Sequence, residues 1–137
     1  MDAAKKHILI VDDDPNTLKT LRYYLQDTYK VTVISSGKVA MEFLLKYKPD
    51  LVLLDYLMPE YNGAVVLKEM QSREETKDIP VYFLTGQTDE QTIRECLELC
   101  PAGYLVKPVA KKALLAKMQE ALDLGTGAIG MKKGKDA

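Results

Sequence analysis

The sequence has few of the residues on which zinc binding and nucleophilic catalysis usually depend. It contains one histidine, His7, and two cysteines, Cys96 and Cys100. Zinc sites usually take four ligands of the Cys or His kind, or three and a water, and His7 lies far along the chain from both cysteines. A single histidine also argues against Ser-His-Asp and Cys-His catalysis. We expect both cysteines to be reduced residues of the core or its boundary, and His7 to have a structural role where a strand begins.

The chain also lacks a strong net charge and any long apolar run. Its formal net charge is −1 at pH 7, so the charge balance favours neither nucleic acid nor an anionic membrane as a partner. No apolar run approaches the roughly 20 residues of a membrane-spanning helix, and the one near the start is too short for a signal peptide. We therefore expect a cytoplasmic protein with no direct nucleic acid contact and no membrane contact.

The sequence does contain a regular alternation of short apolar runs and stretches of helical periodicity. Strands are predicted at 7–11, 30–35, 50–55, 79–85 and 103–107, and helices at 15–27, 37–47, 64–72, 88–99 and 110–122. This alternation predicts an α/β fold, a doubly wound five-stranded parallel sheet with helices on both faces. The flavodoxin-like strand order 2-1-3-4-5 is the common one at this size.

Length and local signals define the domain and the ends of its elements. The 137 residues suit one domain, which should span 6–124, with the glycine- and lysine-rich segment 125–137 as a flexible tail or the start of a linker. Asp14 suits the N-cap of the first helix, Thr88 begins a capping box ahead of the fourth, and Gly63 should belong to the loop after the third strand. One face of the second helix should be buried, that of Val39, Phe43 and Leu44.

Polar residues fall at the carboxyl ends of the predicted strands. Asp12 and Asp13 follow the first strand, Asp55 ends the third, Thr85 ends the fourth and Lys107 ends the fifth. Ligands of doubly wound sheets bind beyond these ends, where the strand order reverses. For the order 2-1-3-4-5 that point lies between strands 1 and 3, so the three aspartates should face one another. Crowded carboxylates destabilise a fold, which indicates a functional reason for the cluster.

A hard divalent cation would stabilise this cluster of carboxylates. Mg²⁺ is typically held by one or two carboxylates and several waters. A phosphate placed directly on aspartates would be repelled, and the glycine-rich loop that nucleotide and flavin binders carry after the first strand is missing. With a cation present, an aspartate could attack a phosphoryl group and form an aspartyl phosphate. Thr85 and Lys107 could then donate hydrogen bonds to the phosphoryl oxygens.

Four motifs resemble those of a known family. "ILIVDDDP", "LVLLDYLMPEYNG", "VYFLTG" and "GYLVKP" occur in this order, each at the end of a predicted strand. Together they resemble the receiver domain of bacterial two-component response regulators, over about residues 6 to 124. The resemblance implies a phosphorylation-dependent signalling switch in a phosphorelay, not an enzyme. It also implies a partner, a histidine kinase or phosphotransfer protein that supplies the phosphoryl group.

The resemblance assigns roles to the residues that match these motifs. Asp55 corresponds to the phosphoacceptor. Asp13 and Asp55 correspond to direct ligands of Mg²⁺, for which Mn²⁺ could substitute, and Asp12 to a ligand that acts largely through water. The backbone carbonyl of Leu57 corresponds to the third protein ligand. Under this assignment the acidic run after the first strand is a preformed cation site.

The resemblance also implies how the phosphorylated state would be sensed. Thr85 and Lys107 correspond to the pair that senses the phosphoryl group, and Tyr104 to an aromatic residue that turns inward on activation. The face of the fourth helix, fifth strand and fifth helix would then change and regulate an unknown output domain or partner. Val109 departs from the family pattern, and "AGY" lacks the acidic pair of receivers that dimerise through this face. We therefore expect a monomer or a weak dimer.

Two other functions fit parts of the sequence. The cluster could belong to a small Mg²⁺-dependent hydrolase with Asp55 as nucleophile. Phosphatases of that kind usually carry a second aspartate two residues after the nucleophile, and this chain lacks it. The chain could also be a scaffold that needs no phosphorylation, although the intact acidic set argues against it. Asp12 and Asp13 could merely cap a helix, and Tyr104 could be a core residue. The sequence names neither kinase nor output, and leaves open whether the chain stands alone or belongs to a longer regulator or hybrid kinase.

Overall fold

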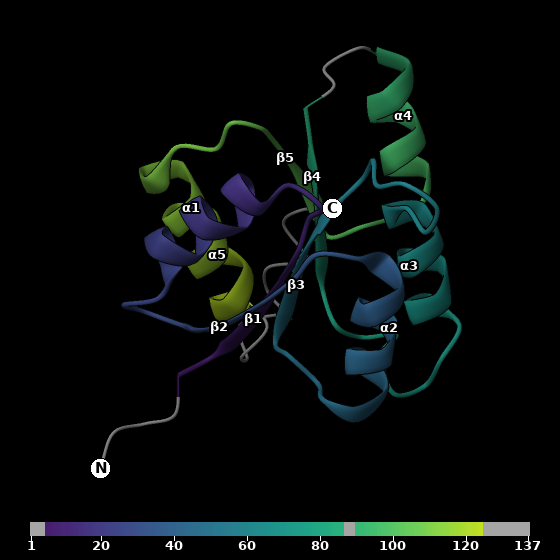
Figure 1. Cartoon of the computed structure of the whole chain (residues 1–137), viewed down its shortest axis with the longest axis horizontal. Helices are drawn as coiled ribbons and strands as arrows, with labels where there is room; N and C mark the ends of the chain where they lie inside the picture. The colour runs from purple at the N-terminus through teal and green to yellow at the C-terminus, as the bar shows by residue number, and fades with distance from the viewer. Residues whose placement is uncertain (1–4, 87–89, 125–137) are drawn as a thin grey trace.

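The computed structural model describes residues 5–86 and 90–124, which form one parallel sheet between two layers of helices (Figure 1). The strands are β1 (His7–Val11), β2 (Lys30–Ile34), β3 (Leu51–Asp55), β4 (Val81–Thr85) and β5 (Gly103–Val106). Their order across the sheet is β2-β1-β3-β4-β5, and every neighbouring pair is parallel. The predicted fold class and strand order are confirmed, so β1 and β3 lie side by side where the order reverses.

The helices cover both faces of the sheet. They are α1 (Pro15–Leu25), α2 (Gly37–Lys46), α3 (Gly63–Gln71), α4 (Glu90–Glu98) and α5 (Lys111–Leu124). Figure 1 shows α1 and α5 on one side of the sheet, and α2, α3 and α4 on the other. Right-handed crossovers produce this division, because the chain moves outward from β1 first in one direction and then in the other. None of these helices is long and apolar enough to cross a lipid bilayer.

The central strands β1, β3 and β4 bury side chains on both faces, which explains their continuous apolar runs. On β1, Ile8 and Ile10 belong to the core cluster beneath α1 and α5, whereas Leu9 and Val11 belong to the cluster beneath α2, α3 and α4. All residues of β3 are buried, including Asp55 at its end. Burial of a carboxyl group costs folding free energy unless the group has hydrogen-bond or charge partners. Asp55 is the one polar residue among the apolar residues of β3, and its burial calls for a functional explanation.

Side-chain caps set the start of the helices next to the carboxyl ends of β1 and β3. Asp14 is the N-cap of α1, as predicted, and its side chain accepts a backbone hydrogen bond in the first turn. The prediction that Gly63 is a loop residue is wrong, because α3 begins at Gly63 after the N-cap Asn62. A Cβ atom on Gly63 would lie 2.4 Å from the carbonyl oxygen of Asp55. Glycine therefore lets α3 start directly against the end of β3.

The buried face predicted for α2 is wrong in part. Val39 is 48% exposed. The buried stripe of α2 begins at Gly37, directly after the cap Ser36, and continues at spacings of three and four residues, which leaves Val39 on the outer face. The buried residues of α2 are Gly37, Ala40, Met41 and Leu44.

Thr88 of the predicted capping box and the predicted tail 125–137 lie outside the described residues.

Cys96 and His7 have the structural roles expected of them, whereas the prediction that Cys100 belongs to the core or its boundary is wrong. Both cysteines are free thiols, Cys96 buried in the core and Cys100 exposed. The backbone N–H of His7 donates to the Asp50 carboxylate at 2.7 Å, and its imidazole Nε2 lies 2.8 Å from the Thr32 hydroxyl. These contacts join the start of β1 to β2 and to the residue before β3.

Candidate functional site

Three carboxylates meet at the carboxyl ends of β1 and β3, where the sequence predicts them. Asp12 and Asp13 follow β1 directly, and Asp55 is the last residue of β3. Oxygen atoms of the three side chains lie within 4.8 Å of one another. Asp12 is 0% exposed and Asp55 is 3% exposed, whereas Asp13 is exposed. The cluster thus combines two buried carboxyl groups with one that faces solvent.

Lys107 brings a positive charge to the cluster from the end of β5. Its Nζ donates to Asp12 Oδ2 at 2.9 Å and lies 3.5 Å from Asp55 Oδ1. The other oxygen of Asp12 accepts the backbone N–H of Asp14 at 2.9 Å. Burial lowers the pKa of Lys107, but the hydrogen bond to Asp12 and the charges of Asp55 and Asp12 outweigh burial and raise it. Lys107 is therefore a fixed cation of this site.

One ammonium group does not balance three neighbouring carboxylates. Burial raises the pKa of Asp55, the charge of Asp12 raises it further and Lys107 opposes the rise, which leaves the pKa at about 7. Added positive charge would lower this pKa and favour the carboxylate form. A hard divalent cation with oxygen ligands meets that need. The donor set therefore fits the Mg²⁺ that the sequence predicts.

Thr85 and Leu57 lie along the chain close to this edge of the sheet. Thr85 ends β4, is 1% exposed, and its carbonyl accepts the Lys107 N–H at 2.8 Å. Asp55 pairs with Leu84, so Thr85 is one residue beyond that pair. Leu57 follows Asp55 by two residues and is 53% exposed. The carboxyl ends of β3, β4 and β5 thus bring the predicted hydroxyl and ammonium groups to the edge that carries the aspartates.

Tyr104 does not lie at this edge. It is opposite Phe83 in the β4–β5 pair, two positions back from Val106, which is opposite Thr85. Its half-buried ring packs against the core cluster beneath α2, α3 and α4. The structure therefore places Tyr104 within the sheet, separate from the carboxylate cluster.

Two tyrosines of the segment after Asp55 make contacts that the sequence did not predict. The Tyr56 hydroxyl donates to Glu95 of α4 at 3.3 Å, and its ring lies edge-on to Phe83 with the ring centroids 5.1 Å apart. The Tyr61 hydroxyl donates to Glu69 of α3. Loop residues follow no periodicity, so no pattern in the sequence indicates these partners.

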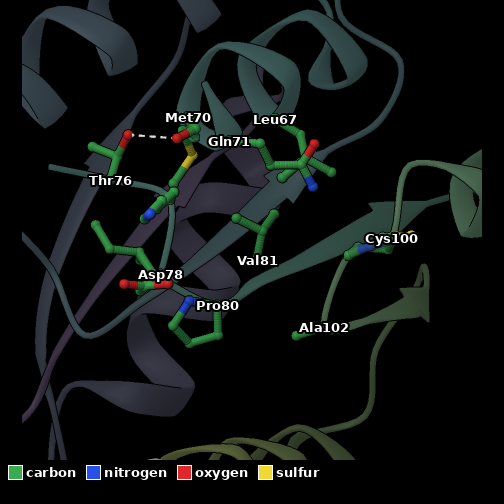
Figure 2. A pocket seen from close by; sticks show the side chains of 12 residues that line it. Leu67, Met70, Gln71, Thr76, Asp78, Pro80, Val81, Cys100 and Ala102 are labelled. Atoms are coloured by element: carbon green, nitrogen blue, oxygen red, sulfur yellow. Dashed lines mark hydrogen bonds between the residues drawn. The ribbon is translucent and has the colours of Figure 1, made fainter. Parts of the chain in front are cut away.

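Two hollows lie at opposite edges of the sheet. A cavity of about 260 Å³ lies at the amino ends of β4 and β5, lined by Val81 and Ala102 (Figure 2). At its wall the Thr76 hydroxyl donates to the Met70 carbonyl at 2.8 Å. A hollow of about 430 Å³ lies between α1 and the segment after β5, and Lys107 lines it. The second hollow, not the first, adjoins the acidic cluster.

Comparison with protein families agrees with this geometry. The model of the family "Response regulator receiver domain" matches residues 8–119. The chain belongs to this family. It is a receiver domain of the two-component type, and the receiver family is a family of phosphoacceptor signalling domains.

Receiver domains similar to this chain occur in larger proteins. The chain is 37% identical over 121 residues to a probable cyclic di-GMP phosphodiesterase of Vibrio cholerae, covering 88% of the chain and 27% of that protein. It is 36% identical over 117 residues to the response regulator SaeR of Staphylococcus aureus, covering 85% of the chain and 50% of that protein. The chain thus spans half or less of the length of these relatives.

A solved receiver domain shows the same fold. This is the receiver domain of the sensor histidine kinase PA1611 of Pseudomonas aeruginosa, solved with a magnesium ion coordinated in its active site cleft. It is 27% identical to this chain, with a TM-score of 0.81, and the match covers 88% of this chain and 99% of that domain.

Proposed function

We propose that this receiver domain is a phosphorylation switch in which Asp55 accepts a phosphoryl group from a partner histidine kinase or phosphotransfer protein. The observation that carries the proposal is the meeting of three aspartates, whose oxygens lie within 4.8 Å, with the ammonium group of Lys107. Carboxylates beside an ammonium group, at the point where the strand order of a doubly wound sheet reverses, suit a site that binds a phosphoryl group together with a cation.

The residues that would hold Mg²⁺ are all oxygen donors. Asp13 and Asp55 would bind it directly, together with the backbone carbonyl of Leu57, and Asp12 would act through water. When bound, Mg²⁺ supplies charge neutralisation for the incoming phosphoryl group; Mn²⁺ is an alternative. The magnesium ion in the active site cleft of the PA1611 receiver domain supports this proposal.

The transfer step needs Asp55 as a carboxylate. One carboxylate oxygen of Asp55 attacks the phosphorus atom, an O–P bond forms, and the P–N bond to the donor histidine breaks. The electron pair of that bond stays on the imidazole nitrogen of the donor. Lys107, which already lies 3.5 Å from Asp55, would pair with the phosphoryl oxygens, and the Thr85 hydroxyl would donate to one of them.

The switch would act through β4 and β5. Thr85, the last residue of β4, and Lys107, the residue after β5, would contact the phosphoryl group, and Tyr104 lies two positions back from the Thr85–Val106 pair. When the Thr85 hydroxyl donates a hydrogen bond to the phosphoryl group, the end of β4 would shift toward that group, and Tyr104 would turn inward. The α4–β5–α5 face would change and regulate an output domain or partner in the cytoplasm, with the receiver as a monomer or weak dimer.

The test is phosphorylation by a small donor. Acetyl phosphate with Mg²⁺ should add one phosphoryl group to the wild-type chain by intact mass, and none to Asp55→Asn. Asp14→Asn is the matched control, since asparagine also caps helices and should leave the modification intact. Turnover of p-nitrophenyl phosphate tests the hydrolase alternative, for which we expect no catalysis above the buffer rate. An adduct that persists in Asp55→Asn would refute the assignment.

A further inference from the structure

The segment that joins Asp55 to α3 is held at Tyr61 from two sides. This segment, residues 56–62, carries the Leu57 carbonyl that the proposed function assigns to the cation. At its start the Tyr56 N–H donates to the Leu84 carbonyl at 2.9 Å. At its end the Gly63 N–H donates back to the Tyr56 carbonyl at 3.0 Å, which closes the loop. Tyr61 lies just before this closure.

On the α3 side, a hydrogen-bonded chain of three side chains holds the Tyr61 hydroxyl. Tyr61 donates to Oε1 of Glu69, and Oε2 of Glu69 accepts from Arg73 at 2.9 Å. Both carboxylate oxygens thus have a donor, and hydrogen bonds to an ionised acceptor are stronger than neutral ones. The bond to Glu69 is the first cause that raises the pKa of Tyr61 to about 12, and the same bond lowers the pKa of Glu69.

On the α2 side, the Tyr61 backbone lies directly against Gly37, the first residue of α2. A Cβ atom on Gly37 would be 2.3 Å from the Tyr61 carbonyl oxygen and 3.0 Å from its ring. Position 37 therefore has no room for a side chain, and its glycine lets the loop backbone pack closely against the start of α2. The half-buried ring of Tyr61 also packs against the core cluster beneath α2, α3 and α4. Tyr61 is therefore enclosed by α2 on one side and tied to α3 on the other.

We propose that Tyr61 is a positioning residue for the phosphoacceptor loop, clamping it between Gly37 of α2 and Glu69 of α3. The inference rests on the proposed function, because it concerns the carbonyl of Leu57, four residues before Tyr61. A main-chain carbonyl can serve as a ligand only where its peptide is held in place, and groups that orient metal ligands affect affinity without touching the metal. The Tyr61 hydroxyl acts in this way, through the backbone of the loop.

The experiment compares Tyr61→Phe with wild type in two measurements. The first is Mg²⁺ affinity, from the cation dependence of the melting temperature. Loss of orienting groups typically weakens metal binding by about 10- to 100-fold, and we expect about tenfold for this variant. The second is amide hydrogen exchange of Gly63 in the metal-free chain, which should be about tenfold faster, with Leu53 of β3 unchanged.

Matched variants separate the clamp from general packing. Glu69→Ala should reproduce both effects of Tyr61→Phe, and Glu69→Gln should retain most of the wild-type behaviour, because its amide oxygen still accepts the phenol hydrogen bond. Tyr23→Phe is the control for loss of an exposed hydroxyl and should change neither quantity. A wild-type chain that takes up neither Mg²⁺ nor phosphoryl refutes the proposed function itself. If the wild type does both, an unchanged Mg²⁺ affinity or an unchanged Gly63 exchange in Tyr61→Phe overturns the clamp alone.

Discussion

Lys107 and Asp12 are 95 residues apart in the sequence, and their side chains meet at 2.9 Å. The same ammonium nitrogen lies 3.5 Å from Asp55. Since Asp12 is fully buried, its charge needs such a partner. The ion pair links the carboxyl ends of β1 and β5 across β3 and β4, and it places the lysine where a phosphoryl group on Asp55 would arrive. Binding and transfer would redistribute the contacts of this lysine without a large movement.

Stability of the metal-free chain should fall as the pH rises from about 4 to about 7. The folded-state pKa of Asp55 is about 7, above the roughly 3.9 of an unfolded aspartate. The folded chain therefore holds this proton more tightly, and the stabilisation is complete at about pH 4 and lost as the pH approaches 7. The expected loss is on the order of a few kcal/mol. Urea unfolding at several pH values measures it.

Asp55→Asn provides the control for that pH dependence. The variant should be more stable than wild type at pH 8 and similar to it at pH 4, because the amide does not ionise. Asp14→Asn should keep the wild-type slope. An equal slope in wild type and Asp55→Asn would show that Asp55 is not the group that titrates.

Millimolar Mg²⁺ should raise the melting temperature of the wild type at pH 8. A ligand that binds only the folded state stabilises it by mass action, by roughly 1.4 kcal/mol at ten times its Kd. Asp13→Ala should abolish this shift, yet melt no lower than wild type without the cation, because it relieves repulsion among the carboxylates. Asp13 is exposed, so its removal leaves no core cavity. The metal site would be wrong if the cation left the wild-type melting temperature unchanged.

The aspartyl phosphate should hydrolyse slowly, because of Leu57. Hydrolysis needs a water held in line with the phosphorus atom, and a leucine side chain two residues past Asp55 offers that water no hydrogen bond. Leu57→Asn supplies donors and acceptors and should speed decay on the order of tenfold, about 1.4 kcal/mol of barrier. Leu57 is 53% exposed, so the substitution should not unfold the chain. Decay is followed by intact mass after the donor is removed; equal or slower decay in Leu57→Asn would contradict this role.

Cys100 should limit the stability of the α4 end of the domain. It has a left-handed backbone with φ 56°, and its N–H donates to the Leu97 carbonyl at 3.0 Å. Glycine is favoured at this position after a helix, so Cys100→Gly should raise the free energy of unfolding by about 1 kcal/mol, the lower end of the cost of a left-handed backbone in a residue with a Cβ atom. Cys100→Ala controls for loss of the thiol and should give no gain. Urea midpoints at unchanged m-value decide the comparison, and equal midpoints for the two variants would argue against backbone strain at this residue.

The fold was predictable because its determinants are local. Strands buried on both faces show as apolar runs, as at 51–54, and helices show their spacing, so the βα alternation and sheet order follow from general rules. The meeting of Asp12 with Asp55 was predictable for the same reason, since strand ends converge at the switch point. The burial of Val39 was predicted wrongly because the register of α2 depends on the Ser36 cap and on Gly37, which fits against Tyr61.

The contacts of the loop after Asp55 were beyond prediction from the sequence. The hydrogen bond from Tyr61 to Glu69 joins a residue without periodicity to one on a helix face, and eight residues separate them. The start of α3 at Gly63 likewise reflects its close approach to the Asp55 carbonyl, which depends on tertiary packing. The sequence also did not indicate that Lys107 pairs with Asp12 as well as with Asp55, because these contacts depend on the distances between strand ends in the folded sheet.

The position of the phosphoryl group on the chain decides whether Asp55 is the phosphoacceptor. The chain should be phosphorylated with acetyl phosphate and Mg²⁺ and reduced with borohydride, which converts an aspartyl phosphate into homoserine, and the modified residue located by peptide mass spectrometry. We expect homoserine at position 55 and aspartate at positions 12 and 13. Homoserine at position 12 or 13, or unmodified aspartate at position 55 in a chain that carries the phosphoryl group, would contradict the assignment of Asp55.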